Sequence, residues 1–282
     1  MGRVGLVMEG GAMRGLFTAG VTDVFLQNGI ELDGAVGVSA GATFGCNYKS
    51  RQMGRALRYN KRFCGDPRYG SIKSWLRSGD LYDAEFCYDT LPRELDVFDT
   101  EAFAANPMAF YAVTTDVRTG KPVYHLCTDG GYDDLQWIRA SASIPVVSRI
   151  VELDGYGLLD GGISDSIPLA FMEREGYERN VVILTQPAGF VKKPYSVMPL
   201  FRVVLRAYPN LIHTLAERHV HYNEQTAYVA QREAEGAAFV LRPPEALNIK
   251  ATTDDPAELQ RVYDIGRAEA ERSLDGLRSF LV

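Results

Sequence analysis

Two short apolar segments near the start of the chain each lead into a glycine-containing turn and then a helical pattern, and this feature constrains the fold most. Residues 3–8 (RVGLVM) predict a buried strand, and the helical pattern of residues 16–27 follows the glycines after it. Residues 34–38 predict a second strand, with another helix from about Ala40. Strands that alternate with helices are typical of a sheet covered on both faces. We therefore expect an α/β fold, a three-layer α/β/α sandwich with a mostly parallel central sheet.

The middle of the chain continues this alternation. The run NVVILT at residues 180–185 is rich in β-branched residues and suits a central parallel strand buried on both faces. Two hairpins are expected, one at the turn 118–120 and one at Asp154-Gly155, a pair that two-residue hairpin turns favour.

Two long helical stretches are predicted in the last third, at about residues 200–235 and 256–280, with a short strand at 238–241 between them. Residues 200–215 are apolar around most of the helix circumference, which favours a core helix kinked at Pro209. A mobile cap that binds an acyl chain is the alternative interpretation.

Composition argues against several classes of protein. Of the 282 residues, 46% are hydrophobic and 23% are charged, values typical of soluble globular chains. Apolar runs stay short of the roughly 20 residues that a membrane span requires, and no signal-peptide pattern opens the sequence, so we expect a cytoplasmic protein. A net charge of -6 argues against general nucleic-acid binding. The four cysteines form no CxxC pair and have no histidine at zinc-site spacing, so no metal is expected.

The segment Gly37-Val38-Ser39-Ala40-Gly41 has the form GxSxG and lies where a predicted strand turns into a predicted helix. Such a turn projects the serine hydroxyl outward, and it needs glycines because strand and helix approach too closely for side chains. The start of the helix also supplies free N–H groups and a positive dipole end near the serine. GxSxG alone also fits an ordinary glycine-rich turn, but the flanking strand and helix favour a nucleophile.

A second glycine-rich turn, residues 9–15 (EGGAMRG), follows the first predicted strand. Acyl transfer passes through a tetrahedral oxyanion, and a loop with few side chains can aim two or three backbone N–H groups at it. Arg14 could hold this loop or contact a phosphate. A dinucleotide site fits poorly, because Ala12 occupies the second glycine of GxGxxG and Asp33 precedes the second strand rather than following it.

A third motif, Leu159-Asp160-Gly161-Gly162, ends an apolar segment. An aspartate followed by glycines at a strand terminus can point into a cleft while the backbone turns away. Alone it would be read as an ordinary Asp-Gly turn, but together with the other two motifs it indicates a site.

These three elements, in this order and spacing, resemble the patatin-like phospholipase family, which combines a glycine-rich oxyanion loop, GxSxG and an Asp-Gly-Gly or Asp-Gly-Ala motif. The resemblance implies Ser39 as nucleophile and Asp160 as the second member of a catalytic dyad. The backbone residues that it implies are an oxyanion loop of Gly10, Gly11 and Ala12, closed by Arg14 and Gly15, and the supporting glycines Gly37, Gly41, Gly161 and Gly162.

The resemblance also implies a division of the chain. Residues 4–172 would form a patatin-like hydrolase core, and residues 173–282 a C-terminal extension packed into the same compact domain. Two departures stand out. Ala12 replaces a third glycine, which a donor loop tolerates because only its N–H is used. Asp165-Ser166-Ile167-Pro168 stands where the family often has Asn before a proline, which predicts a more acidic cleft.

The implied activity is that of a serine acyl hydrolase without a cofactor, cleaving carboxylic esters of lipids as a phospholipase A does, through an acyl-enzyme intermediate. A thioesterase or acyltransferase with the same dyad is the alternative. An aspartate has an ordinary pKa of about 4, and burial would raise it toward that of a useful base. His125 lies on a predicted strand and the other histidines, His213, His219 and His221, on a late helix, so none is expected in a triad.

Four arginines, Arg51, Arg55, Arg58 and Arg62, recur at helical spacing after the GxSxG segment. A solvated helix face is one interpretation. The other is peripheral contact with an anionic membrane, where each basic residue would contribute about 1 kcal/mol.

Overall fold

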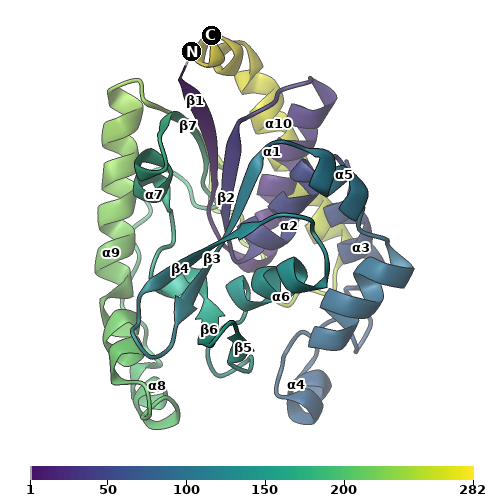
Figure 1. Cartoon of the computed structure of the whole chain (residues 1–282), viewed down its shortest axis with the longest axis vertical. Helices are drawn as coiled ribbons and strands as arrows, with labels where there is room; N and C mark the ends of the chain where they lie inside the picture. Colours follow the sequence, from purple (N-terminus) through teal and green to yellow (C-terminus); the bar gives the residue numbers. More distant parts are fainter. Residues whose placement is uncertain (1) are drawn as a thin grey trace.

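A computed structural model describes residues 2–282, with the side chains of residues 72 and 73 left out. Its centre is an eight-stranded sheet of order β5-β6-β3-β2-β1-β7-β8, in which β4 also pairs with β3 (Figure 1). The strands are β1 (Arg3–Met8), β2 (Gly34–Val38), β3 (Ala109–Asp116), β4 (Pro122–Cys127), β5 (Val151–Leu153), β6 (Tyr156–Asp160), β7 (Tyr177–Ile183) and β8 (Ala238–Leu241).

Five neighbouring strands, from β3 through β2, β1 and β7 to β8, run parallel. The remaining pairings, β4 and β6 with β3 and β5 with β6, are antiparallel. The expected α/β fold with a mixed, mostly parallel sheet is therefore confirmed. Both hairpins are also confirmed, and Asp154 and Gly155 have φ values of 48° and 81°, the positive values that such a turn requires.

Helices cover both faces of the sheet (Figure 1). The helices on one face are α1 (Gly15–Gln27), α2 (Ala40–Lys49), α3 (Arg55–Phe63) and α10 (Pro256–Leu281), and on the other α7 (Leu169–Arg174) and α9 (Pro209–Ala234). Shorter helices are α4 (Ile72–Ser78), α5 (Thr100–Ala105), α6 (Tyr132–Ser141) and α8 (Met198–Val204), with the single turns η1 (Ala12–Arg14) and η3 (Gly161–Ile163) and the wider helix η2 (Phe86–Leu95).

The central strands are apolar at nearly every position because they contribute to two cores. Leu6 and Met8 of β1 pack into a cluster with α1, α2 and α10, whereas Val7 faces the cluster under α7 and α9. Burying one such side chain contributes roughly 1.5–3 kcal/mol. Continuous apolar runs rather than alternation are what a sheet covered on both faces requires.

The C-terminal helix lies directly on the first helix. A Cβ atom added at Gly20 of α1 would lie 2.2 Å from the carbonyl oxygen of Tyr263, and one at Gly266 of α10 would lie 2.1 Å from that of Phe17. Only glycine allows the two backbones to approach this closely. Residues from opposite ends of the chain therefore share one core.

The helix predicted over residues 200–235 is interrupted, so the prediction of one core helix kinked at Pro209 is wrong. α8 ends at Val204, and α9 begins at Pro209, where a residue without an N–H fits the first helical position. α8 is not a core helix either, because Val203 is 69% exposed. Phe201 and Leu205 are buried, so this helix is amphipathic.

Within the described part of the chain, no helix has the length and hydropathy that crossing a bilayer requires.

Candidate active site

Ser39 lies between β2 and α2 in a strained conformation, with φ of 55° and ψ of −120°. A residue with a side chain rarely adopts positive φ, and such strain gathers at functional sites. A Cβ atom at Gly37 would lie 2.6 Å from the Ala42 nitrogen, and one at Gly41 would lie 2.3 Å from the Met8 carbonyl oxygen. The sharp strand-to-helix bend thus requires both glycines, as a nucleophile elbow does.

Asp160 lies at the end of β6, where it pairs with Thr114 of β3. Its side chain is buried and lines the same cavity as Ser39. It also accepts a bond of 2.7 Å from the Gly162 N–H. Burial raises the pKa of Asp160 above its ordinary value, and the nearby Ser39 hydroxyl, the Arg218 cation and the Gly162 bond oppose that rise. Two motifs more than a hundred residues apart thus meet at one hydroxyl–carboxylate pair.

The glycine-rich loop after β1 lines the same pocket as Ser39 and Asp160. The Thr185 hydroxyl donates to the Gly10 carbonyl at 2.9 Å, which anchors the loop to the end of β7. In residues 2–282, no acceptor receives a hydrogen bond from the N–H groups of Gly10 and Gly11. Ala12 has a φ of 48° and begins η1, which Arg14 ends and Gly15 follows. The loop therefore presents backbone donors beside Ser39.

Glu9 supports this loop through buried hydrogen bonds, a contribution that the sequence motifs did not reveal. Its buried carboxylate accepts bonds from the Thr185 N–H at 2.6 Å and the Tyr222 hydroxyl at 2.7 Å. Burial raises the pKa of Glu9, and these two bonds oppose the rise. One side chain therefore ties β1, β7 and α9 together beneath the loop.

Two cavities meet at Ser39, and they differ in chemistry. The first, of about 130 Å³, is mostly apolar. The apolar residues that line it include Met13, Phe44, Tyr59, Leu91, Leu135 and Ile138. The second, of about 180 Å³, contains Asp160 and is more polar. Ala12, Ser39 and Ile144 line both.

The polar cavity contains residues that sequence reasoning did not identify. Lys192 and Tyr195 come from the segment after β7, and Arg218 and Tyr222 come from α9. None belongs to a local motif, because each reaches the site only through the packing of distant segments. Their sole sequence signal is their residue type.

The prediction of a more acidic cleft is wrong. Asp165 does not line the polar cavity; its carboxylate accepts bonds of 2.6 Å from the Tyr124 hydroxyl and 2.6 Å from the Gln225 side chain. Ser166 lines the cavity instead.

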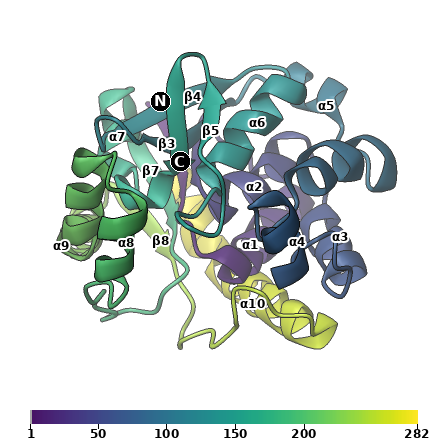
Figure 2. The ribbon, with the colours of Figure 1, turned by 90° about the horizontal axis from the view of Figure 1, so that it is seen from below.

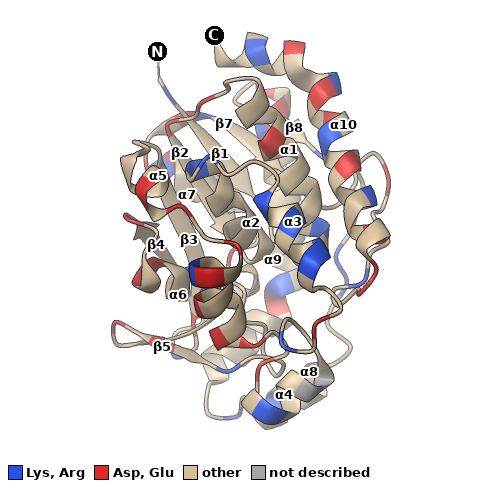
Figure 3. Ribbon diagram, turned by 90° about the vertical axis from the view of Figure 1, so that its right-hand side faces the viewer, with Lys and Arg blue, Asp and Glu red and all other residues tan. Residues whose placement is uncertain are grey.

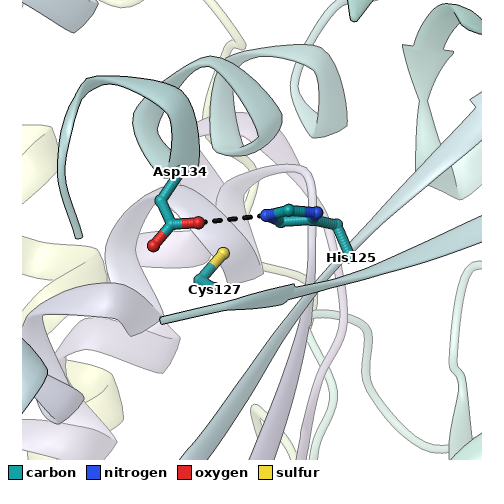
Figure 4. A group of neighbouring side chains, drawn as sticks. All are labelled: His125, Cys127 and Asp134. Atoms are coloured by element: carbon teal, nitrogen blue, oxygen red, sulfur yellow. Dashed lines mark hydrogen bonds and ion pairs between the residues drawn. The ribbon is translucent and has the colours of Figure 1, made fainter. Parts of the chain in front are cut away.

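In the part of the chain that the structure describes, no histidine lines either cavity. His125 instead joins a separate cluster with Cys127 and Asp134 (Figure 4). The His125 ring lies 3.0 Å from the Asp134 carboxylate and stacks on Trp137.

The three residues of this cluster are of types that can bind a metal ion, and their spacing in the sequence did not suggest a metal site. One Asp134 oxygen already accepts bonds from the N–H groups of Thr128, Asp129 and Gly130, and the other faces His125. Burial holds the pKa of the Cys127 thiol well above its ordinary value, which opposes the thiolate that a metal needs. The arrangement holds the loop that precedes α6 and orients the His125 ring.

The four arginines predicted as one helical stripe do not form a free cationic face, because each of them bonds to another part of the chain. Arg51 lies in the turn before α3 and pairs with Glu31 at 2.6 Å. Arg55 is buried and pairs with Asp96 at 3.3 Å, so membrane contact through Arg55 is excluded. Arg58 also binds Asp96, at 2.7 Å, and Arg62 donates to the Leu95 carbonyl at 2.8 Å. The blue segments of α3 in Figure 3 thus include cations that stabilise the fold.

Comparisons with known proteins agree with these motifs. Residues 6–172 match the family described as patatin-like phospholipase, and residues 208–282 match a domain of unknown function (DUF6363). YjjU, an uncharacterized protein of Escherichia coli (strain K12), is 30% identical over 271 residues, which cover 94% of this chain and 75% of YjjU.

Other relatives are more distant. Lysophospholipase nte1 of Emericella nidulans is 32% identical over 180 residues, which cover 61% of this chain and 11% of that protein. An uncharacterized NTE family protein of Mycobacterium tuberculosis is 29% identical over 168 residues, 60% of this chain and 45% of the relative. The crystal structure of VipD from Legionella pneumophila aligns with 98% of this chain and 67% of VipD, at 12% identity and a TM-score of 0.47.

Proposed function

Because the chain belongs to the patatin-like phospholipase family, we propose that it is a serine acyl hydrolase that cleaves carboxylic esters of lipids through Ser39 and Asp160. The observation that carries this proposal is that Ser39 and the buried Asp160 carboxyl line one cavity, close enough for the Ser39 hydroxyl to lower the pKa of that carboxyl. The similarity to a lysophospholipase supports a lipid ester as the substrate.

In the proposed reaction, Ser39 Oγ attacks the ester carbonyl carbon while the Asp160 carboxylate accepts the hydroxyl proton. The negative charge that develops on the carbonyl oxygen is stabilised by the N–H groups of Gly10, Gly11 and Ala12. The C–O bond to the alcohol then breaks, and Asp160 returns the proton to the departing alkoxide. Water attacks the acyl-enzyme in the same way, releasing the fatty acid and restoring both side chains.

The apolar cavity would hold the acyl chain of the substrate. It begins at Ser39 and extends between α2, η2 and α6, where Phe44, Leu91 and Ile138 face it. Burial of apolar surface contributes about 25 cal/mol per Å². A chain of several methylene groups would therefore bind here in preference to a short one.

The test is loss of turnover in Ser39→Ala and Asp160→Asn proteins, with labelling by a fluorophosphonate probe as a second readout. The unmodified protein and Asp160→Asn should differ in labelling rate, and Ser39→Ala should not label. Labelling that survives Ser39→Ala at full extent would contradict the proposal. Product analysis with phospholipid, acyl-CoA and p-nitrophenyl esters distinguishes a hydrolase from a thioesterase or acyltransferase.

A lipid substrate must reach Ser39 from an aggregate, and we propose that α4 and α8 face it. Both helices lie at the end of the molecule that carries β5 and β6, on opposite sides of it (Figures 1 and 2). Leu76 in α4 and Val203 in α8 are 75% and 69% exposed. The double variant Leu76→Ser, Val203→Ser should bind lipid vesicles more weakly, and Arg51→Ala should not. Weaker binding by Arg51→Ala alone would favour the arginines instead.

We also propose that residues 4–172 and 173–282 form one folding unit. β7 and β8 extend the sheet beside β1, and α10 packs on α1 through Gly20 and Gly266.

A further inference from the structure

We propose that the polar cavity beside Ser39 binds a phosphate group of the substrate through Arg14, Lys192 and Arg218. The substrate class would be an acyl ester that carries a terminal phosphate a few bonds from the ester. This inference rests on the proposed function, because it places the phosphate on the molecule that Ser39 attacks.

Arg14 provides a donor without an acceptor. Its side chain lines the cavity, and its Nε is buried with no hydrogen-bond partner among residues 2–282. A buried N–H group is nearly always paired in a folded protein, so an unpaired one indicates a missing partner. Guanidinium groups bind phosphate oxygens strongly because their N–H groups match them in charge and geometry.

Lys192 also faces the cavity without an acceptor in the described part of the chain. Its Nζ lies 4.1 Å from the centre of the Tyr222 ring. Among the described residues, no carboxylate lies within 4.0 Å of this Nζ. Burial lowers the pKa of Lys192 to about 8, with the nearby cations Arg218 and Arg14 adding to the decrease and Glu9 opposing it. An anion between these groups would relieve the repulsion.

Arg218 is held in place and still has a free donor. Its Nε donates to the Gly162 carbonyl and its Nη1 to the Tyr195 hydroxyl, which fixes the guanidinium plane against the loop after Asp160. Its Nη2 makes no hydrogen bond to any residue that the structure describes. The cation is therefore preorganised for a ligand rather than paired with a carboxylate.

The two carboxylates of this cavity are already engaged elsewhere. Glu9 is bonded through both oxygens to Thr185 and Tyr222, and Asp160 accepts a bond from the Gly162 N–H beside Ser39. The three cations therefore outnumber the two acids, and none of them forms an ion pair with a carboxylate in the described part of the chain. This excess of positive charge favours a phosphate over a zwitterionic or neutral head group.

The position of the cavity defines the substrate further. It shares Ser39 and Ile144 with the apolar cavity, so an ester at Ser39 would direct its acyl chain to one side and its phosphate to the other. Lys192 and Arg218 lie after residue 172, and Arg218 lies within the match to the domain of unknown function. The C-terminal part of the chain would thus supply head-group recognition.

The main test compares kcat/KM for a monoacylglycerol phosphate and for a monoacylglycerol with the same acyl chain. Lys192→Met should lower the ratio of the two values about tenfold. Lys193→Met, which alters an exposed neighbour outside the cavity, should leave the ratio unchanged. An equal loss on both substrates in Lys192→Met would overturn the inference. Absence of Ser39-dependent turnover with either substrate in the unmodified protein would instead refute the proposed function.

Ligand protection gives a readout that does not need catalysis. In Ser39→Ala protein, glycerol 3-phosphate should raise the melting temperature, and the further change Lys192→Met should abolish that shift. No shift would count against the site. Protection by inorganic phosphate, combined with an unchanged kcat/KM ratio in Lys192→Met, would mean that the cavity serves a free phosphate ion and not a lipid head group.

Discussion

Replacing Asp160 with asparagine separates catalysis from stability in the proposed dyad. Asparagine has nearly the volume of aspartate, and its Oδ1 can still accept the 2.7 Å bond from the Gly162 N–H. It cannot accept the Ser39 proton, because the amide is not basic. The fold should therefore persist while the general base disappears.

The expected loss of activity follows from the role of a general base, which contributes about 10²–10⁴-fold to a rate. The kcat of Asp160→Asn should thus fall by a factor in this range, equivalent to roughly 3–5 kcal/mol of barrier. In the unmodified protein, kcat/KM should decline as pH falls through the pKa of Asp160, which burial raises above its ordinary value. The acid limb should therefore lie above pH 4, the ordinary range of an aspartate.

The stability effect has the opposite sign. Because the pKa of Asp160 is raised in the folded state, folding favours its protonated form, and stability from this group declines as pH rises through that pKa. At neutral pH the charged carboxylate is therefore a cost. Asp160→Asn should have a melting temperature equal to or higher than that of the unmodified protein at pH 7.

Initial rates on a p-nitrophenyl ester and a thermal melt on the same samples test both effects. His125→Ala is the matched control, since His125 bonds to Asp134 outside either cavity. Its kcat should stay within about twofold of the unmodified value. Full activity in Asp160→Asn, or abolished activity in a folded His125→Ala protein, would refute the dyad.

Three further predictions concern the fold. Arg55→Met should lower the free energy of unfolding by about 1–3 kcal/mol in a urea titration, because it leaves the buried Asp96 carbonyl and the Asn47 side-chain oxygen without their donor. Arg51→Ala should change it by less than about 1 kcal/mol, because Arg51 forms an exposed ion pair. Equal effects would contradict the assigned burial. Gly266→Ala should cost about 1–3 kcal/mol, since its Cβ would lie 2.1 Å from a backbone oxygen, and Gly276→Ala, with its nearest contact at 3.4 Å, should be tolerated. A fragment ending at residue 172 should show no cooperative melt, and a sharp transition would mean that the core folds alone.

The sequence alone identified the parts of the site whose geometry is local. The bend at residues 37–41 was predictable because strand and helix leave no room for a Cβ atom at Gly37 or Gly41. The hairpin at Asp154-Gly155 was predictable because few residue pairs tolerate two positive φ values. The alternation of strands and helices predicted the sheet for a similar reason, since each element must bury its own apolar face. The pairing of Ser39 with Asp160 came from the resemblance and not from spacing.

Other features were decided only by tertiary packing. Arg55 and Arg51 look alike in the sequence, yet one is buried against Asp96 and the other lies at the surface. Lys192 and Arg218 reach the cavity from separate segments, and neither lies in a pattern that marks it. The neighbouring sequence does not predict the partner of a long cationic side chain. That partner depends on which distant segments meet, and this depends on the whole fold.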